Sequence, residues 1–311
     1  MIDVSIIVLT YNQEDTVKRT LDSIVNQNTK YTYEIIINDD DSKDNTRKVC
    51  EKFCETHGNV TKMVEYHPNY GVVKNYWDTL RRCSGKYLMQ CAGDDWWHNT
   101  NKIEIQVSYM ENHPDVVLHY GGFLTYYPAT NVKQYFAPYH ISGDVFETLL
   151  WRNFICAPTV CIKHSAMDNI HFERFVDEGF MIEDHPIYLG LSKEGVFAYS
   201  DEALVTYSAQ YGSINNCVSF NKKRVYLDNE RVYKFFFVQE RGESEKYSQI
   251  IDNSYYYMLA KYAVRFGERK IARDAYKKIK PKNTKVFFKM LLCSCGITFR
   301  YLNKRFNANL K

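Results

Sequence analysis

The sequence predicts an α/β fold, with a mixed, mainly parallel sheet between helices, followed by an α-helical appendage. In the first half, short apolar runs alternate with amphipathic segments, as strands alternate with helices in layered α/β proteins. From about residue 221 the chain changes to long helical stretches rich in Tyr and Lys. With 311 residues and 45% hydrophobic content, the chain is long enough for one large domain and an appendage.

Each element of the first half follows from its local pattern. Compact apolar runs predict strands at 4–11, 33–38, 60–66 and 86–91. The amphipathic segments between them predict helices near 14–27, 44–57, 72–83 and 101–112. Two later runs, 116–127 and 132–137, are typical of an antiparallel addition to the sheet.

The charge is divided unevenly along the chain. Residues 261–311 hold 15 Lys and Arg against two acids, a net charge of +13, whereas the whole chain carries only +3. Residues 1–260 therefore carry −10, and the basic end predicts an anionic partner. No nucleic-acid motif is present, so we expect peripheral contact with the inner membrane surface; a solvated basic helical surface is the alternative.

The last predicted helix has an apolar stripe but is too short to cross a bilayer. Only ten uncharged residues separate Lys289 from Arg300. The stripe suits either an interfacial helix or packing against the rest of the protein. Its members recur every three or four residues: Phe288, Leu291, Cys295, Phe299, Leu302 and Phe306.

The cysteines and the first residues predict a cytoplasmic protein. The nine cysteines are odd in number and show no zinc-type spacing, so we expect free thiols in a reducing compartment. The first residues, "MIDVSIIVLTYN", lack the basic and apolar regions of a signal peptide.

Polar residues follow three of the predicted strands where each strand ends. They are Thr10-Tyr11-Asn12, Asn38 to Ser42, and Gly93-Asp94-Asp95. Ligands of open α/β sheets bind at the carboxyl ends of strands, so these residues predict a site on one edge. Each group alone also suits a turn or a helix cap.

The crowded carboxylates at this edge indicate a cation. Like charges at short distance need compensation, and Mg²⁺ or Mn²⁺ binds one or two carboxylates together with water and substrate phosphates. A phosphorylated ligand, such as a diphosphate, is therefore expected. Neither common glycine-rich phosphate loop is present, which disfavours P-loop and dinucleotide-binding folds.

Six ordered blocks carry a family resemblance. They are "VSIIVLTYNQEDTVKRTLDSIVNQ", "EIIINDDDSKDNT", "NYGVVKN", "GKYLMQCAGDDWW", "IEDHPIYLGLSKEG" and "DEALVTYSAQYGS". In order and spacing they resemble the family 2 inverting glycosyltransferases of the GT-A fold, especially bacterial surface-polysaccharide enzymes. The resemblance covers residues 1–215, which it implies form the glycosyltransferase domain. Residues 216–311 would form the basic helical region.

The resemblance implies roles for individual residues at the donor end of the site. Thr10 and Tyr11 would line the nucleotide pocket, and Asp39 or Asp40 would accept a hydrogen bond from the base, typically uracil. Asn69, Gly71 and Asn75 match the family's loop near the diphosphate, and Lys74 would contact a phosphate.

The resemblance also implies a metal ligand and a catalytic base. Asp94 would hold the cation across the two phosphates, and Asp95 would support it or start the next helix. Asp184 would take the proton of the acceptor hydroxyl. Without the resemblance, Asp184 suits a helix-start carboxylate that faces the macrodipole. Trp96 would wall the acceptor side or pack, and Trp97 would pack.

The implied function is metal-dependent transfer of a sugar, with inversion, in surface-polysaccharide synthesis. The donor would be a nucleotide-diphosphate sugar, typically a UDP-sugar, and the acceptor a glycan or a lipid-linked glycan. The chain departs from the family where an acid, a glycine, an arginine and a histidine are usual: Ala92, Asp41, Ser208 and Gln210. A non-catalytic nucleotide-sugar or glycan-binding protein of the same fold is the alternative.

Overall fold

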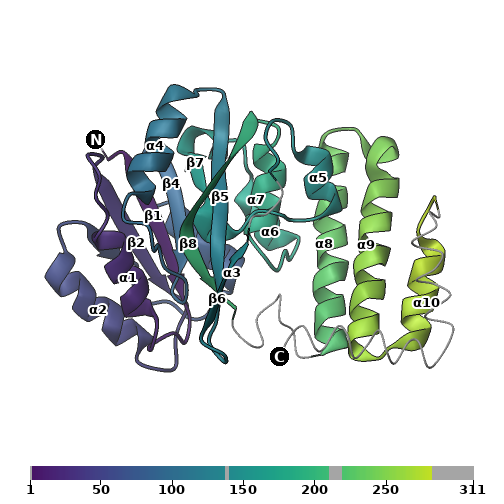
Figure 1. Cartoon of the computed structure of the whole chain (residues 1–311), viewed down its shortest axis with the longest axis horizontal. Helices are drawn as coiled ribbons and strands as arrows, with labels where there is room; N and C mark the ends of the chain where they lie inside the picture. The colour runs from purple at the N-terminus through teal and green to yellow at the C-terminus, as the bar shows by residue number, and fades with distance from the viewer. Residues whose placement is uncertain (1, 137–139, 210–218, 282–311) are drawn as a thin grey trace. The chain divides into compact units, whose positions relative to one another are not determined.

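The computed structural model describes residues 2–136, 140–209 and 219–281. The chain divides into two compact units, a sheet unit and a helical unit (Figure 1). The first unit comprises Met1–Phe146 and Phe154–Ala209, and the second Glu147–Asn153 and Gln210–Lys311.

The first unit is built on one eight-stranded sheet of order β3-β2-β1-β4-β7-β5-β6, with β8 paired to β5. The strands are β1 (Val4–Thr10), β2 (Tyr33–Asp39), β3 (Thr61–Met63), β4 (Tyr87–Ala92), β5 (Val116–Tyr127), β6 (Val132–Phe136), β7 (Cys161–Lys163) and β8 (Val196–Ser208). β1 to β4 pair in parallel, as do β5 and β8. β7 is antiparallel to β4 and β5, and β6 is antiparallel to β5. The predicted mixed, mainly parallel sheet is confirmed.

Helices of this unit pack around the sheet. They are α1 (Val17–Val25), α2 (Thr46–His57), α3 (Val72–Leu80), α4 (Lys102–Asn112), α6 (Phe172–Asp177) and α7 (Asp184–Leu191). α1 begins three residues later than the sequence predicted, because the Thr16 and Val17 N–H groups both bond the Gln13 carbonyl in a preceding turn. α3 and α6 meet through stacked rings, with Trp77 5.0 Å from Phe172.

The core lies along the central strands. Val4, Ile6 and Val8 of β1 are fully buried, as are Ile35 and Ile37 of β2. These near-continuous apolar runs are typical of parallel strands covered on both faces.

Glu34 ties the amino ends of the strands together. Its carboxylate accepts hydrogen bonds from Ser5 Oγ (2.7 Å), from Ser84 N (2.8 Å) and Oγ (2.7 Å), and from Lys62 Nζ (2.6 Å). Burial opposes its ionisation, but these donors outweigh burial and lower the pKa of Glu34 to about 2. The network joins β1, β2, β3 and the turn before β4, at the edge away from the polar strand ends.

Lys102, the first residue of α4, is fully buried. Its Nζ donates to Gln106 Oε1 (2.5 Å) and lies 4.3 Å from the Trp97 ring centroid. Gln106 Nε2 in turn donates to the Thr159 carbonyl (2.9 Å). Burial lowers the pKa of Lys102 to about 8.

The second unit is helical. Its helices are α5 (Phe146–Trp151), α8 (Phe220–Glu240), α9 (Ser244–Phe266) and α10 (Arg269–Lys278). The predicted helical texture after residue 221 is thus present, and α5, which precedes β7 in the chain, belongs to the same unit.

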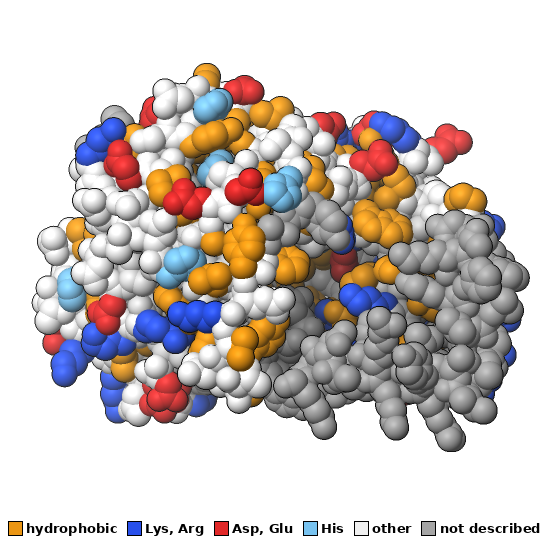
Figure 2. Space-filling view, viewed as in Figure 1, with side chains coloured by type: hydrophobic (Ala, Val, Ile, Leu, Met, Phe, Trp, Pro, Cys, Tyr) orange, Lys and Arg blue, Asp and Glu red, His pale blue; other side chains and the backbone are white. Residues whose placement is uncertain are grey.

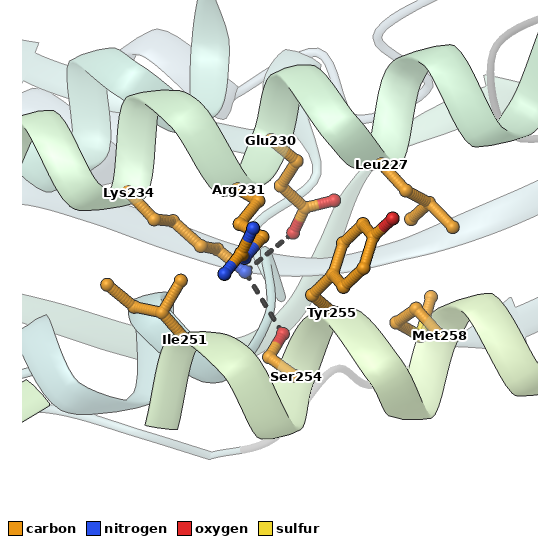
Figure 3. Close-up of a pocket in the computed structure, with 8 residues that line it drawn as sticks. All are labelled: Leu227, Glu230, Arg231, Lys234, Ile251, Ser254, Tyr255 and Met258. Atoms are coloured by element: carbon orange, nitrogen blue, oxygen red, sulfur yellow. Dashed lines mark hydrogen bonds and ion pairs between the residues drawn. The ribbon is translucent and has the colours of Figure 1, made fainter. Parts of the chain in front are cut away.

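A buried lysine links α8 to α9 (Figure 3), and its partner Ser254 continues the link to α5. Lys234 Nζ of α8 donates to Glu230 Oε1 (2.6 Å) and to Ser254 Oγ of α9 (3.2 Å). Ser254 Oγ donates to the Trp151 carbonyl of α5. Beside it, Arg231 binds Asp252 through two nitrogens.

Across the described parts of both units, every helix is too short or too polar to traverse a bilayer. The predicted last helix, with Lys289, Cys295 and Arg300, lies outside the described residues.

Candidate functional site

The structure brings three polar strand ends together at one edge of the sheet. Thr10, the last residue of β1, is paired with Asp39 of β2, and Leu9 is paired with Ala92 of β4. The Gly93 N–H donates to the Leu9 carbonyl (3.0 Å). The predicted convergence of the strand ends is confirmed.

Gly93 allows β4 to end against β1. A Cβ at this position would lie 2.5 Å from Gln13 Oε1 and 2.7 Å from Thr10 Oγ1, so only glycine fits without displacement. Thr10 is buried, and its Oγ1 donates to Gln13 Oε1 (2.8 Å). Tyr11, which follows, is exposed.

Asp39 and Asp40 are both buried at the end of β2, but their carboxylates accept hydrogen bonds from different parts of the chain. Asp39 accepts hydrogen bonds from Ser42 N (3.2 Å) and from Ser42 Oγ. Asp40 accepts from the N–H groups of Tyr70 (2.8 Å) and Gly71 (3.0 Å). Asp40 therefore anchors the loop before α3, while Asp39 is held by its own turn.

The loop and first turn of α3 place the two predicted diphosphate residues differently. Lys74 Nζ lies 3.4 Å from the Tyr70 ring centroid, close to the loop that Asp40 holds. Asn75 is buried, and its carbonyl accepts from Asn38 Nδ2 (3.3 Å). Asn75 Oδ1 is buried with no partner in the described part of the chain.

Asp94 and Asp95 lie in an environment that disfavours two negative charges. Burial raises the pKa of Asp94, and burial together with the Asp94 charge raises the pKa of Asp95. Asp95 Oδ1 accepts from Ser208 N (2.7 Å) of β8. Arg19 Nη2 of α1 donates to the Asp94 carbonyl (3.0 Å). A bound cation would relieve the repulsion within the pair.

The surroundings of the pair offer few other protein ligands. Ala92, where the family usually has an acid, is exposed next to Gly93. Within residues 2–136, 140–209 and 219–281 no group of three or more His, Cys, Asp or Glu is arranged to hold a metal. Ser208 contributes its backbone N–H to Asp95, and Gln210 lies outside the described residues.

The two tryptophans after the pair have different environments. Trp97 is buried in the core, as the sequence predicted. Trp96 is partly exposed, with the Arg19 guanidinium 3.8 Å above its ring and the Tyr126 ring at 5.5 Å edge-on. Lys133 of β6 lies 5.2 Å from the same ring.

Asp184 is the first residue of α7. Burial raises the pKa of the Cys156 thiol, and the charges of Asp95 and Asp184 raise it further. The His185 N–H donates to Asp184 Oδ1 (2.6 Å), which also suits a carboxylate at a helix start.

Three residues around the candidate site were not predicted from the sequence: Glu183, Arg19 and Cys156. Burial and the adjacent Asp184 charge raise the pKa of Glu183 to about 8, so Glu183 is mostly protonated at neutral pH. Its signal was the "ED" doublet, a second pair of adjacent acids. Arg19 and Cys156 carried no sequence signal, because only the fold brings Arg19 over the Trp96 ring and exposes Cys156 to the charges of Asp95 and Asp184.

Comparison with known proteins identifies the family and the fold. The profile of glycosyl transferase family 2 matches residues 5–165. An uncharacterised Mycobacterium tuberculosis protein is 31% identical over 51% of this chain and 46% of its own length. The chain thus spans about half of that relative. The Escherichia coli UDP-Glc:alpha-D-GlcNAc-diphosphoundecaprenol beta-1,3-glucosyltransferase WfaP is 28% identical over 74% of this chain and 85% of its own.

Two solved structures share the GT-A fold at low sequence identity. Staphylococcus aureus TarS 1–349, solved with UDP-GlcNAc, has a TM-score of 0.52 and 14% identity, covering 99% of this chain and 92% of its own. The mannosyltransferase PcManGT from Pyrobaculum calidifontis, solved with GDP-Man and Mn²⁺, has a TM-score of 0.58 and 15% identity, covering 98% and 84%. These likenesses show the fold.

Proposed function

Because this chain belongs to glycosyl transferase family 2, we propose that it transfers a sugar from a nucleotide-diphosphate sugar, preferably a UDP-sugar, to an acceptor hydroxyl. The acceptor is a glycan or a lipid-linked glycan, the anomeric centre is inverted, and the setting is bacterial surface-polysaccharide synthesis. The name of the E. coli relative, which specifies a UDP-Glc donor and a diphosphoundecaprenol-linked acceptor, supports this choice.

The observation that carries the proposal is the meeting of the ends of β1, β2 and β4 at one edge of the sheet, where Asp39 and the acid pair Asp94 and Asp95 lie. A transferase needs charge compensation at the leaving diphosphate and a base at the attacking hydroxyl, on opposite sides of one anomeric carbon. The acid pair would meet the first need through a cation, and Asp184, the first residue of α7, is the carboxylate proposed for the second.

In this proposal the donor lies along the ends of β1 and β2. Asp39 accepts the ring N–H of uracil, since the bonds from Ser42 hold its carboxylate in one orientation. Asp40 positions the loop before α3, which it anchors, and Lys74 at the start of that helix contacts the diphosphate. Thr10 lines the floor of the nucleotide pocket beside Tyr11.

Asp94 and Asp95 are the residues that would hold Mn²⁺ or Mg²⁺. Their donor set fits a hard cation, because both are carboxylates, and a cation would offset the burial that raises both pKa values and the Asp94 charge that further raises the pKa of Asp95. When bound, the ion supplies positive charge to the diphosphate leaving group. With Ala92 beside the pair, the remaining ligands are substrate phosphates and water.

Asp184 is the proposed base. It takes the proton of the acceptor hydroxyl as that oxygen bonds the anomeric carbon, while the nucleoside diphosphate leaves with the bonding electrons. Glu183, protonated at neutral pH, adds no second negative charge at the acceptor position. Asp184 therefore acts as the base of the doublet.

The test uses the purified full chain with Mn²⁺ and a panel of UDP- and GDP-sugars. Asp184→Asn should leave donor affinity within about twofold and lower turnover by about 10²- to 10⁴-fold. The matched control is Asp177→Asn, an exposed carboxylate that ends α6. Equal turnover in the two variants would remove Asp184 from the reaction, and no donor binding across the panel would refute the whole proposal.

The limited donor set around Asp94 favours one rival, a nucleotide-sugar or glycan-binding protein without catalysis. Calorimetry separates the two functions. Donor affinity that is equal with Mn²⁺ and with EDTA supports the rival, whereas donor affinity that requires the ion supports the transferase.

We further propose that the basic region 216–311 contacts the inner face of the cell membrane. The support is the net charge of +13 over residues 261–311. Vesicle flotation of the full chain against a chain ending at Lys280 tests it, because equal binding would exclude a contribution from the last 31 residues.

A further inference from the structure

Residues 66–71, called the donor loop below, lie between β3 and α3 and are fixed to the end of β2. The Asp40 carbonyl accepts a hydrogen bond from Asn69 Nδ2 (2.8 Å), in addition to the bonds that the Asp40 carboxylate accepts from Tyr70 and Gly71. The Nζ of Lys74, the proposed diphosphate contact, lies 3.4 Å from the Tyr70 ring centroid. A residue that fixes the donor loop therefore also fixes the position of the Lys74 ammonium.

His67 is a half-buried histidine of the donor loop, and both of its ring nitrogens face oxygen atoms. Nδ1 lies 2.8 Å from the Pro68 carbonyl oxygen, and Nε2 lies 2.8 Å from Asn38 Oδ1 of β2. The ring stacks on the Tyr70 ring, with centroids 4.5 Å apart and planes 2° apart. His67 thus connects β2 to the aromatic ring that Lys74 contacts.

The orientation of the buried Asn38 amide is fixed by its contacts with α3. Its Nδ2 donates to Thr79 Oγ1 (2.9 Å) and to the Asn75 carbonyl (3.3 Å). The Asn75 carbonyl can only accept, and the Thr79 hydroxyl donates its own proton to that carbonyl (2.7 Å), so both contacts need the Asn38 amide nitrogen. The atom that faces His67 is therefore Oδ1, which accepts a hydrogen bond and cannot donate one.

These partners require a positively charged His67 ring. A neutral imidazole carries one N–H and one bare nitrogen, whereas both nitrogens of His67 face atoms that only accept. In a neutral ring, the bare nitrogen would lie 2.8 Å from an oxygen that offers it no proton. Only the imidazolium can donate both hydrogen bonds, so the donor loop in this arrangement is fully bonded only while His67 is protonated.

Charged groups of both signs lie on the donor loop and on the elements packed against it. Asp41 accepts a hydrogen bond from the Tyr66 hydroxyl (3.1 Å) and pairs with Lys43 (2.6 Å). Figure 2 shows Lys and Arg side chains gathered over the lower left of the sheet unit, where Figure 1 shows α1 and α2. Negative charges favour the imidazolium and positive charges oppose it. The groups are Asp40, Asp41 and Glu65 on one side of this balance, and Lys43, Arg47 and Lys74 on the other.

We propose that protonated His67 is a positioning residue for the donor: it holds the donor loop against β2 and thereby places Lys74 at the diphosphate. Histidine changes charge between pH 5 and 8, so the loop is held most firmly at the acidic end of this range. Donor binding and protonation of His67 favour each other, because both stabilise the same arrangement of the loop. The inference rests on the proposed function and adds a pH dependence to its donor site.

The first test reads the ring directly and needs no ligand. The full chain is labelled with ¹⁵N-histidine, and the His67 signals are assigned by their loss in His67→Gln. Both ring nitrogens should be protonated at about pH 6, and one at about pH 8.5. A His67 ring that carries a single proton at about pH 6 would overturn the proposal.

The second test compares the affinity of the parent and of His67→Gln for UDP, by calorimetry with saturating Mn²⁺. The parent should bind about fivefold more tightly at about pH 6, and the two affinities should be equal at about pH 8.5. Because both proteins share the metal site, the ratio of their affinities removes the pH dependence of that site. A purely structural role for His67 would give a ratio that does not change with pH, and this result would contradict the proposal.

The matched control is His113→Gln. His113 is exposed at the end of α4, and its Nδ1 faces the Tyr109 carbonyl (2.8 Å), a single acceptor that a neutral ring satisfies. Its affinity for UDP should stay within about twofold of the parent at both pH values.

The proposed function fails by a different readout. A parent chain that binds no nucleotide of the donor panel with Mn²⁺ at any pH would refute the transferase, and the positioning role with it. A parent that binds UDP with a constant ratio to His67→Gln would refute the role of His67 alone.

Discussion

Replacing Gly93 by alanine should perturb both the fold and the donor end of the site. The added Cβ would lie 2.5 Å from Gln13 Oε1 and 2.7 Å from Thr10 Oγ1, whereas ordinary contacts begin at 3.4 Å. Thr10 and Gln13 must therefore separate from β4 by about 0.7 to 0.9 Å, a displacement typical of overpacked sites. The hydrogen bond between them, 2.8 Å long, is strained or lost.

The expected cost follows from these two effects. Overpacking destabilises by about 1–3 kcal/mol, and loss of a buried hydrogen bond adds about 1 kcal/mol. We therefore expect the free energy of unfolding, measured by urea titration, to fall by about 2–4 kcal/mol. Donor affinity, measured by calorimetry with Mn²⁺, should fall about tenfold or more, because Thr10 and Asp94 flank the altered position.

The control is Gly58→Ala at the end of α2. Gly58 has right-handed helical angles (φ −61°, ψ −12°), so alanine can adopt its backbone conformation, and the added Cβ would lie 3.1 Å from the Cys54 carbonyl oxygen, a smaller overlap than at Gly93. If Gly93→Ala matched this control within about 0.5 kcal/mol and bound donor as the parent does, the close approach of β1 and β4 would not matter to the site.

Three further predictions concern buried charges. Glu34→Gln should lower the free energy of unfolding at pH 7 by about 2 kcal/mol. Because the folded-state pKa of Glu34 is about 2, the difference between parent and variant, measured by urea titration, should disappear as pH falls from about 4.5 to 2. Lys102→Met should raise the free energy of unfolding at pH 7, because it removes a buried charge. The difference between variant and parent should shrink by about 3 kcal/mol as pH rises from about 8 to 10.5, because the folded parent loses that charge over this range. A difference that does not change with pH would contradict this. Mn²⁺ affinity, measured by calorimetry, should rise with pH, because protons compete for Asp94 and Asp95, whose pKa values are raised; flat affinity from pH 5 to 8 would speak against this pair as the metal site.

Most of the sheet and its functional edge could be predicted from the sequence. The apolar runs at β1, β2 and β4 are local signals, and the polar residues that end them follow directly in the chain. The position of Thr10 beside Asp39 then depends only on the parallel pairing of neighbouring strands.

The contacts that distinguish neighbouring acids could not be predicted. Asp39 and Asp40 look alike in the sequence, but Asp39 binds Ser42 nearby, whereas Asp40 binds Tyr70 and Gly71, 30 and 31 residues away. Likewise Arg19 reaches Trp96 only through the packing of α1 beside the end of β4. Long-range geometry of this kind leaves no periodic trace in a single chain.

Helix α5 limits how the protein can be divided experimentally. The segment 147–153, which holds most of α5, belongs to the helical unit but interrupts the sheet unit, so the backbone passes between units three times. A chain cut after residue 215 would keep Trp151 while losing Ser254, the donor to its carbonyl, and Tyr257, whose ring lies 5.9 Å from its indole. A catalytic fragment would therefore need a short polar linker in place of 147–153, and no single cleavage yields two intact halves.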